Sequence, residues 1–241
     1  MDNIQIETTN NKQIVTYYSE ANDQSKKIVI MSHGFRGSSL GPARQFVDFQ
    51  KILNKNGYSV LRFDQPNSGN SDGDYVDSSF LEWVQTTVFL ADKYINSGYQ
   101  VALLGQSMGA TTSVIAASSP KLKGKIVCLL LWVPDAKSDV DVDPSRIYEE
   151  GGQKYKGSFW TEARDSNFFD CLESYNGGIH LVYGEVDRYV KKALIDKTIR
   201  IVEEKGHPVM VLKGQDHSPW EFDVVQKVYK NGLEVLHKFM K

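Results

Sequence analysis

The sequence has 241 residues, of which 41% are hydrophobic and 24% charged, and its formal net charge is −2. This length is ordinary for a single α/β domain, and the composition is that of a soluble globular protein. The small net charge, with lysine and arginine scattered along the chain, argues against nucleic acid or an anionic membrane as a partner.

The first residues, the longest apolar run and the two cysteines indicate in which compartment the protein is found. The first residues are acidic and polar, without the basic and apolar regions of a secretory signal. The longest apolar run, 126–133, has the length of a strand and is too short to cross a bilayer. Cys128 and Cys171 show neither a disulfide framework nor metal-ligand spacing. We therefore expect a cytoplasmic protein with no metal and no membrane contact.

Predicted strands and helices alternate along the chain. It opens with β-rich segments at 4–6 and 13–18, which predict an antiparallel hairpin at a sheet edge. The buried strands predicted after it are 27–32, 58–64, 101–104, 125–133, 179–184 and 208–213. The predicted helices are 43–56, 79–96 (opened by the capping box Ser79-x-x-Glu82), 108–117, 190–204 and 222–240. This order predicts a mostly parallel sheet with helices on both faces.

One interval breaks the alternation. Residues 134–178 are too many for a simple connection, and they hold an acidic patch at 135–143 and several aromatic residues. We interpret the interval as a cap inserted over the carboxyl edge of the sheet, within a single domain of residues 1–241. The alternative is an exposed insertion whose aromatic residues pack only against one another.

The stretch Gly105-x-Ser107-x-Gly109 follows a buried strand and precedes a helix. A serine on such a turn projects from the sheet with its hydroxyl free, and the glycines relieve crowding where strand and helix cross. A second Gly-x-Ser-x-Gly surrounds Ser71, but four residues separate it from its strand and no helix follows. We interpret Ser107 as a nucleophile and Ser71 as structural.

A nucleophilic serine needs a base, and the base needs a carboxylate to orient it. Of the five histidines, His217 is the one that follows the carboxyl end of a strand after Ser107. After the preceding strand come Glu185 and Asp187, and we favour Asp187 because it lies further beyond the strand end. Glu185 remains the alternative carboxylate for this role, and it could instead cap a helix or pair with Arg188.

The developing oxyanion needs backbone N–H donors. Met108, directly after the nucleophile, is one candidate. The other is Phe35 in the glycine-rich loop His33-Gly34-Phe35-x-Gly37, although this loop could also be only a tight turn.

Five motifs in this order cover nearly the whole chain: His33-Gly34-Phe35-x-Gly37, Phe63-Asp64-x-x-x-x-Gly69-x-Ser71, Gly105-x-Ser107-x-Gly109, Gly184-x-x-Asp187 and Gly214-x-x-His217. Together they resemble the serine α/β-hydrolase family, and most closely its small cinnamoyl/feruloyl esterase-like carboxylesterases. The resemblance implies an α/β-hydrolase fold with an eight-stranded, mostly parallel sheet, a Ser-Asp-His triad and no cofactor. Gln106 departs from the histidine that is common beside the nucleophile in this family.

These residues predict a carboxylic ester hydrolase that acts on small-molecule esters with small or aromatic acyl groups through an acyl-enzyme. The aromatic residues of the cap are expected to line an apolar pocket. A thioesterase, a peptidase or a C–C bond hydrolase would use the same triad and remains an alternative. An alternative of another class is a catalytically silent binding protein.

Overall fold

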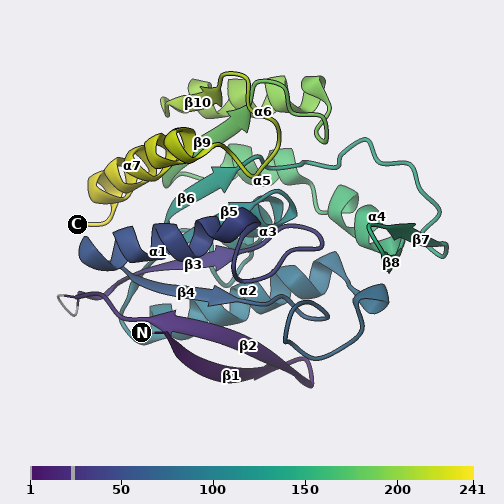
Figure 1. Cartoon of the computed structure of the whole chain (residues 1–241), viewed down its shortest axis with the longest axis horizontal. Helices are drawn as coiled ribbons and strands as arrows, with labels where there is room; N and C mark the ends of the chain where they lie inside the picture. Colours follow the sequence, from purple (N-terminus) through teal and green to yellow (C-terminus); the bar gives the residue numbers. More distant parts are fainter. Residues whose placement is uncertain (1, 23–24) are drawn as a thin grey trace.

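An eight-stranded sheet forms the centre of the molecule (Figure 1). The computed structural model describes residues 2–22 and 25–241. The strands of the sheet are β1 (Asn3–Thr9), β2 (Lys12–Ser19), β3 (Lys27–Ser32), β4 (Ser59–Phe63), β5 (Gln100–Gln106), β6 (Ile126–Trp132), β9 (Gly178–Gly184) and β10 (Val209–Leu212). Their order across the sheet is β1-β2-β4-β3-β5-β6-β9-β10.

The pairing of these strands follows their sequence pattern. The hairpin β1–β2 is antiparallel and lies at one edge, as predicted, and β2 also pairs antiparallel with β4. All other neighbours are parallel. Every residue of β4 and β9 is buried, because a parallel strand covered on both faces needs apolar side chains in both directions. The predicted fold class, a mostly parallel eight-stranded sheet, is confirmed.

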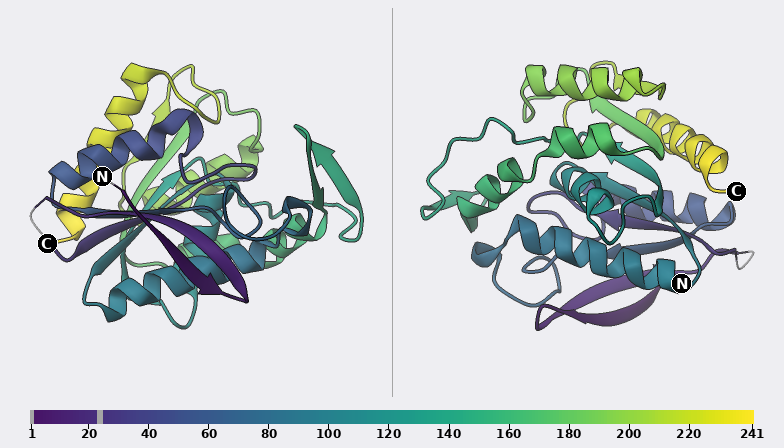
Figure 2. Two further views of the ribbon diagram at one scale, coloured as in Figure 1. Left: turned by 60° about the horizontal axis from the view of Figure 1, so that its bottom comes forward. Right: turned by 180° about the vertical axis from the view of Figure 1, so that it is seen from behind.

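Helices cover both faces of the sheet (Figure 2). They are α1 (Gln45–Lys55), α2 (Phe80–Asn96), α3 (Met108–Ser118), α4 (Ser158–Asp165), α5 (Phe168–Ser174), α6 (Lys192–Glu204) and α7 (Phe222–Phe239). On one face α1 packs against α7, and on the other α2, α3, α5 and α6 follow one another in contact. Two short 3₁₀ turns, η1 (Pro42–Arg44) and η2 (Tyr75–Asp77), lie in the loops.

The predicted capping box at the start of α2 is half formed. The Ser79 hydroxyl accepts the N–H of Glu82 at 3.2 Å, as expected for an N-cap. The Glu82 carboxylate pairs instead with Lys12 of β2, at 2.7 Å. The hydroxyl of Ser79 also donates to the carboxylate of Glu162, in α4, at 2.7 Å. A distant carboxylate thus takes part in capping α2.

The interval 134–178 contains a hairpin, β7 (Ile147–Glu150) and β8 (Gln153–Lys156), and the helices α4 and α5. In Figure 1 the hairpin and α4 project beyond the sheet at the right of the view. Helix α5 packs instead against α3 and α6, in the layer that covers the sheet. Within the interval 134–178, the projecting part is the hairpin and α4, residues 147–165, and from here on the name cap refers to this part alone.

Within the described residues, no helix is both long and apolar enough to cross a membrane. Cys128 and Cys171 are free thiols.

Candidate active site

Ser107 lies on the turn between β5 and α3 with a strained backbone, φ 54° and ψ −123°. A non-glycine residue in such a conformation costs about 1–3 kcal/mol and persists only where its surroundings hold it. The Ser107 N–H donates to the carbonyl of Trp132 at 2.8 Å, and its own carbonyl accepts the N–H of Ala110 at 2.9 Å. The turn is therefore fixed from both sides, and the side chain faces a cavity.

The two glycines of the motif stand where α3 crosses the strands. A Cβ at Gly105 would overlap the carbonyl oxygen of Gly109, and a Cβ at Gly109 would overlap the carbonyl oxygen of Ser32 at the end of β3. The predicted steric role of both glycines is confirmed. Because these glycines have no side chains, α3 can approach the sheet closely behind Ser107.

His217 and Asp187 meet at the carboxyl edge of the sheet, from the loops after β10 and β9. The Nδ1 of His217 lies 2.7 Å from Oδ2 of Asp187, whose side chain is fully buried. Oδ1 of Asp187 accepts the N–H groups of Tyr189 and Val190, at 2.9 and 3.0 Å. Because the ionised carboxylate only accepts hydrogen bonds, Nδ1 carries the proton and Nε2 is left as an acceptor.

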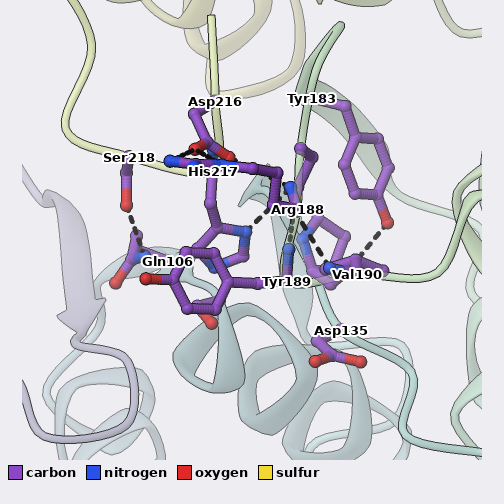
Figure 3. Close-up of polar contacts among 12 residues, drawn as sticks. Gln106, Asp135, Tyr183, Arg188, Tyr189, Val190, Asp216, His217 and Ser218 are labelled. Carbon is purple, nitrogen blue, oxygen red and sulfur yellow. Dashed lines mark hydrogen bonds and ion pairs between the residues drawn. The ribbon is translucent and has the colours of Figure 1, made fainter.

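Glu185 has a different role from Asp187. Its Oε2 accepts the N–H of Gly214 at 2.8 Å, so it braces the turn after β10. The suggested pairing of Glu185 with Arg188 is wrong, because the Nε of Arg188 donates to Asp216 at 2.6 Å. Asp216 also accepts the N–H groups of Arg188 and His217, at 3.0 and 2.8 Å, and so joins the two loops (Figure 3).

Two further side chains support the loop and the ring of His217. The Nε2 of Gln106 donates to the hydroxyl of Ser218 at 2.9 Å, linking the turn at Ser107 to the histidine loop. The ring of Tyr189 lies 5.2 Å from that of His217, between centroids, and overlies it in Figure 3. The sequence places Gln106 beside the nucleophile without indicating its contact with Ser218, and it gives no signal for Tyr189.

The proposed oxyanion donors have free N–H groups. Met108 is the first residue of α3, where no intrahelical acceptor exists. Among the described residues, neither the N–H of Met108 nor that of Phe35 has a hydrogen-bond partner. The loop that carries Phe35 is anchored by His33, whose Nδ1 donates to the carbonyl of Gly34 at 2.8 Å and whose Nε2 accepts the N–H of Gln65 at 3.0 Å. Burial lowers the pKa of His33, so its ring is neutral and structural.

These groups line one cavity of about 520 Å³, at the carboxyl edge of the sheet. Its walls include Ser107, His217, Phe35, Met108 and Tyr189. Of the aromatic residues predicted in the interval, Trp160 lines it, whereas Phe159 and Phe168 are buried elsewhere in the core. No cluster of histidine, cysteine, aspartate or glutamate within the described part of the chain is placed to hold a metal ion.

Two ion pairs also line the cavity, so its walls are more polar than expected. Arg36 pairs with Glu150 at 2.8 Å, and Lys137 pairs with Asp135 at 2.6 Å. The Lys137 ammonium lies 4.6 Å above the centre of the Trp160 ring, within range of a cation–π contact. Asp135 follows the end of β6 closely, so the rule that functional groups gather at strand ends could have identified it.

Ser71 is a structural residue, as interpreted. Its hydroxyl donates to the carbonyl of Asp64 at 2.7 Å and accepts the N–H of Val15 at 2.9 Å. Both its donor and its acceptor capacity are engaged, and it joins the loop after β4 to β2.

Solved structures with a similar fold share little of this sequence. A search of the curated proteins found no match. Among solved structures, Est1E from Butyrivibrio proteoclasticus with ferulic acid bound has a TM-score of 0.83 at 20% identity, covering 97% of this chain and 99% of Est1E. The α/β hydrolase domain-containing protein 10 from mouse has a TM-score of 0.78 at 17% identity, covering 98% of this chain and 99% of the mouse protein. A soluble variant of monoglyceride lipase from Saccharomyces cerevisiae has a TM-score of 0.77 at 14% identity, covering 99% of this chain and 95% of the lipase.

These similarities show that the fold is that of the α/β hydrolases. Residues 23–156, more than half of the chain, match the family described as serine aminopeptidase, S33. This match includes the loop at Phe35 and the turn at Ser107. The chain therefore belongs to the serine aminopeptidase S33 family of α/β hydrolases.

Proposed function

We propose that this chain is a carboxylic ester hydrolase that works through Ser107, His217 and Asp187. The observation that carries the proposal is the 2.7 Å contact between His217 Nδ1 and the fully buried carboxylate of Asp187, at a cavity that His217 shares with Ser107. Orientation by a buried carboxylate suits an imidazole that must become a cation during catalysis.

The reaction would proceed in two halves. Oγ of Ser107 attacks the ester carbonyl while Nε2 of His217 takes its proton, and the N–H groups of Phe35 and Met108 hold the oxyanion. His217 then gives the proton to the departing alcohol, which leaves the acyl group on Ser107. A water molecule, deprotonated by His217, attacks the acyl carbonyl and releases the acid, and the proton returns to Ser107.

The cavity supports a small or aromatic acyl group, because aromatic rings of Phe35, Trp160 and Tyr189 line it. The structural likeness to Est1E, solved with ferulic acid bound, supports the same choice. We propose a small-molecule ester as the substrate.

Aminopeptidase activity is the second candidate, because the matched family carries that description. An aminopeptidase must hold the ammonium group of its substrate, which favours a free carboxylate in the cavity. Here Asp135 and Glu150 line the cavity, and each already faces a cation, Lys137 and Arg36. This neutralisation favours an uncharged ester over a peptide with a free amino terminus.

The test compares two serines. Ser107→Ala should remove labelling by a fluorophosphonate probe and lower kcat for short p-nitrophenyl esters by on the order of 10⁵-fold or more, with an unchanged Tm. Ser71→Ala is the matched control. It should keep the activity but lower the Tm, because it leaves a buried carbonyl and a partly buried N–H without their partner.

Retained turnover in Ser107→Ala, or no probe adduct on Ser107 in the wild type, would overturn the proposal. A panel of alkyl esters, hydroxycinnamate esters, thioesters and aminoacyl anilides then separates the alternatives. Preference for aminoacyl anilides would favour the aminopeptidase.

A further inference from the structure

The loop that carries the proposed oxyanion donor is enclosed by the cap. The Phe35 ring lies 4.4 Å from the ring of Trp160, 4.9 Å from that of Tyr155 and 5.1 Å from that of Phe159, between centroids. All three partners belong to β8 or α4. Tyr75, in η2, completes the cluster at 5.5 Å. The side chain of Phe35 is thus set mainly by the cap, while its N–H is left free.

The next residue ties the same loop to the cap hairpin. Arg36 has a left-handed backbone, with φ 58°, and its N–H donates to the hydroxyl of Tyr75 at 2.7 Å. Its guanidinium donates to Oε1 of Glu150 at 2.8 Å. Gly151, at the hairpin turn, packs so closely that a Cβ there would overlap the guanidinium. The backbone that presents the Phe35 N–H is therefore held between η2 and the hairpin.

The cap has other attachments to the core, which do not depend on the Arg36–Glu150 pair. Glu162 of α4 accepts hydrogen bonds from the Ser79 hydroxyl at 2.7 Å and the Leu81 N–H at 3.2 Å. Lys156 of β8 pairs with Asp77 of η2 at 2.5 Å. Loss of the Arg36–Glu150 pair alone should therefore leave the cap in place.

We propose that Glu150, acting through Arg36, is a positioning residue for the oxyanion hole, so that the cap sets the catalytic rate as well as substrate selection. This inference rests on the proposed function. The Glu150 side chain is 48% exposed and that of Arg36 is 29% exposed. A pair so accessible to solvent contributes little to stability, so its removal should not unfold the chain. The position of an oxyanion donor, in contrast, strongly affects the rate.

The experiment uses the whole chain and p-nitrophenyl acetate, whose acetyl group is far too small to fill the cavity. Glu150→Ala should lower kcat about tenfold while KM changes by less than about twofold, because loss of a whole donor costs about 10²–10³. The rate constant for fluorophosphonate labelling of Ser107 should fall in parallel, since the phosphonyl oxygen occupies the same hole. Glu162→Ala is the matched control, because it removes the cap-to-core hydrogen bonds to Ser79 and Leu81, which do not involve the loop, and it should change neither rate.

A double-mutant cycle tests whether Glu150 acts through Arg36. Arg36→Met with Glu150→Ala should be no slower than the slower single variant, because both remove one interaction. Unchanged kcat and labelling rate in Glu150→Ala, a loss confined to KM, or additive losses in the cycle would each overturn the inference. If the wild type itself is not labelled at Ser107, the proposed function fails. If the wild type is labelled and Glu150→Ala behaves like it, this inference alone fails.

Discussion

Replacement of Asp187 by asparagine keeps the size of the side chain but exchanges one acceptor atom for a donor. The N–H groups of Tyr189 and Val190 both donate to Oδ1, and the amide oxygen of asparagine can replace that atom. The amide nitrogen then faces His217 Nδ1 at the position that Oδ2 holds, 2.7 Å away. Two donors cannot share one hydrogen bond, so the imidazole must move its proton to Nε2.

A histidine protonated at Nε2 cannot take the proton of Ser107. We expect kcat to fall about 10⁴-fold, the size of this effect in serine hydrolases, which equals about 5 kcal/mol of transition-state stabilisation. The assay is steady-state hydrolysis of short p-nitrophenyl esters together with the rate of fluorophosphonate labelling.

Glu185→Gln is the matched control for this substitution. The amide oxygen of glutamine can still accept the N–H of Gly214, so kcat should stay within about twofold of the wild type. The reasoning would be refuted if Asp187→Asn lost less than tenfold, or if Glu185→Gln lost more than Asp187→Asn.

Two predictions concern stability. Gly109→Ala should lower the free energy of unfolding by about 3 kcal/mol or more, because the added Cβ meets backbone atoms of Ser32. Gly124 has φ +76° and open space around it, so Gly124→Ala should lower that free energy by only about 1 kcal/mol. Equal losses for the two variants in urea melts would contradict the packing argument. Burial lowers the pKa of His180 to about 4, so between pH 6.5 and 4 the unfolded chain binds a proton that the folded chain does not. The wild type should therefore lose about 3 kcal/mol more than His180→Leu on acidification from pH 7 to 4, and identical losses would exclude His180 as the cause.

Local sequence signals identified much of the fold because their physics is local. An unbroken apolar run can only be a buried segment, and a glycine-flanked serine between strand and helix predicts a sharp turn. The boundaries of most elements differ from the prediction by at most two residues, and β1 ends three residues later than predicted. The first turn predicted for α1 is a 3₁₀ turn containing Ala43 at φ 46°. The capping box at Ser79 formed only in part, because Lys12, far away in the chain, attracts Glu82.

The cavity was harder to predict, since its walls come from segments distant in sequence. The sequence predicts that the acidic patch at 135–143 belongs to the inserted interval over the sheet, but it does not predict that Asp135 lines the cavity in an ion pair with Lys137. Arg36 and Glu150 are separated by 114 positions and meet because the hairpin folds over the loop after β3. No periodicity within either segment encodes that contact.

The sequence by itself determined the α/β alternation, the turn at Ser107 and the order in which Asp187 and His217 follow it, because these depend on short-range sterics and on strand ends meeting at one edge. Only the tertiary structure decided which carboxylate faces His217, since Asp187 and Glu185 differ by two positions and accept hydrogen bonds from different loops. It also decided that the cap encloses the Phe35 loop, because aromatic packing and ion pairing between distant segments depend on how the whole chain folds.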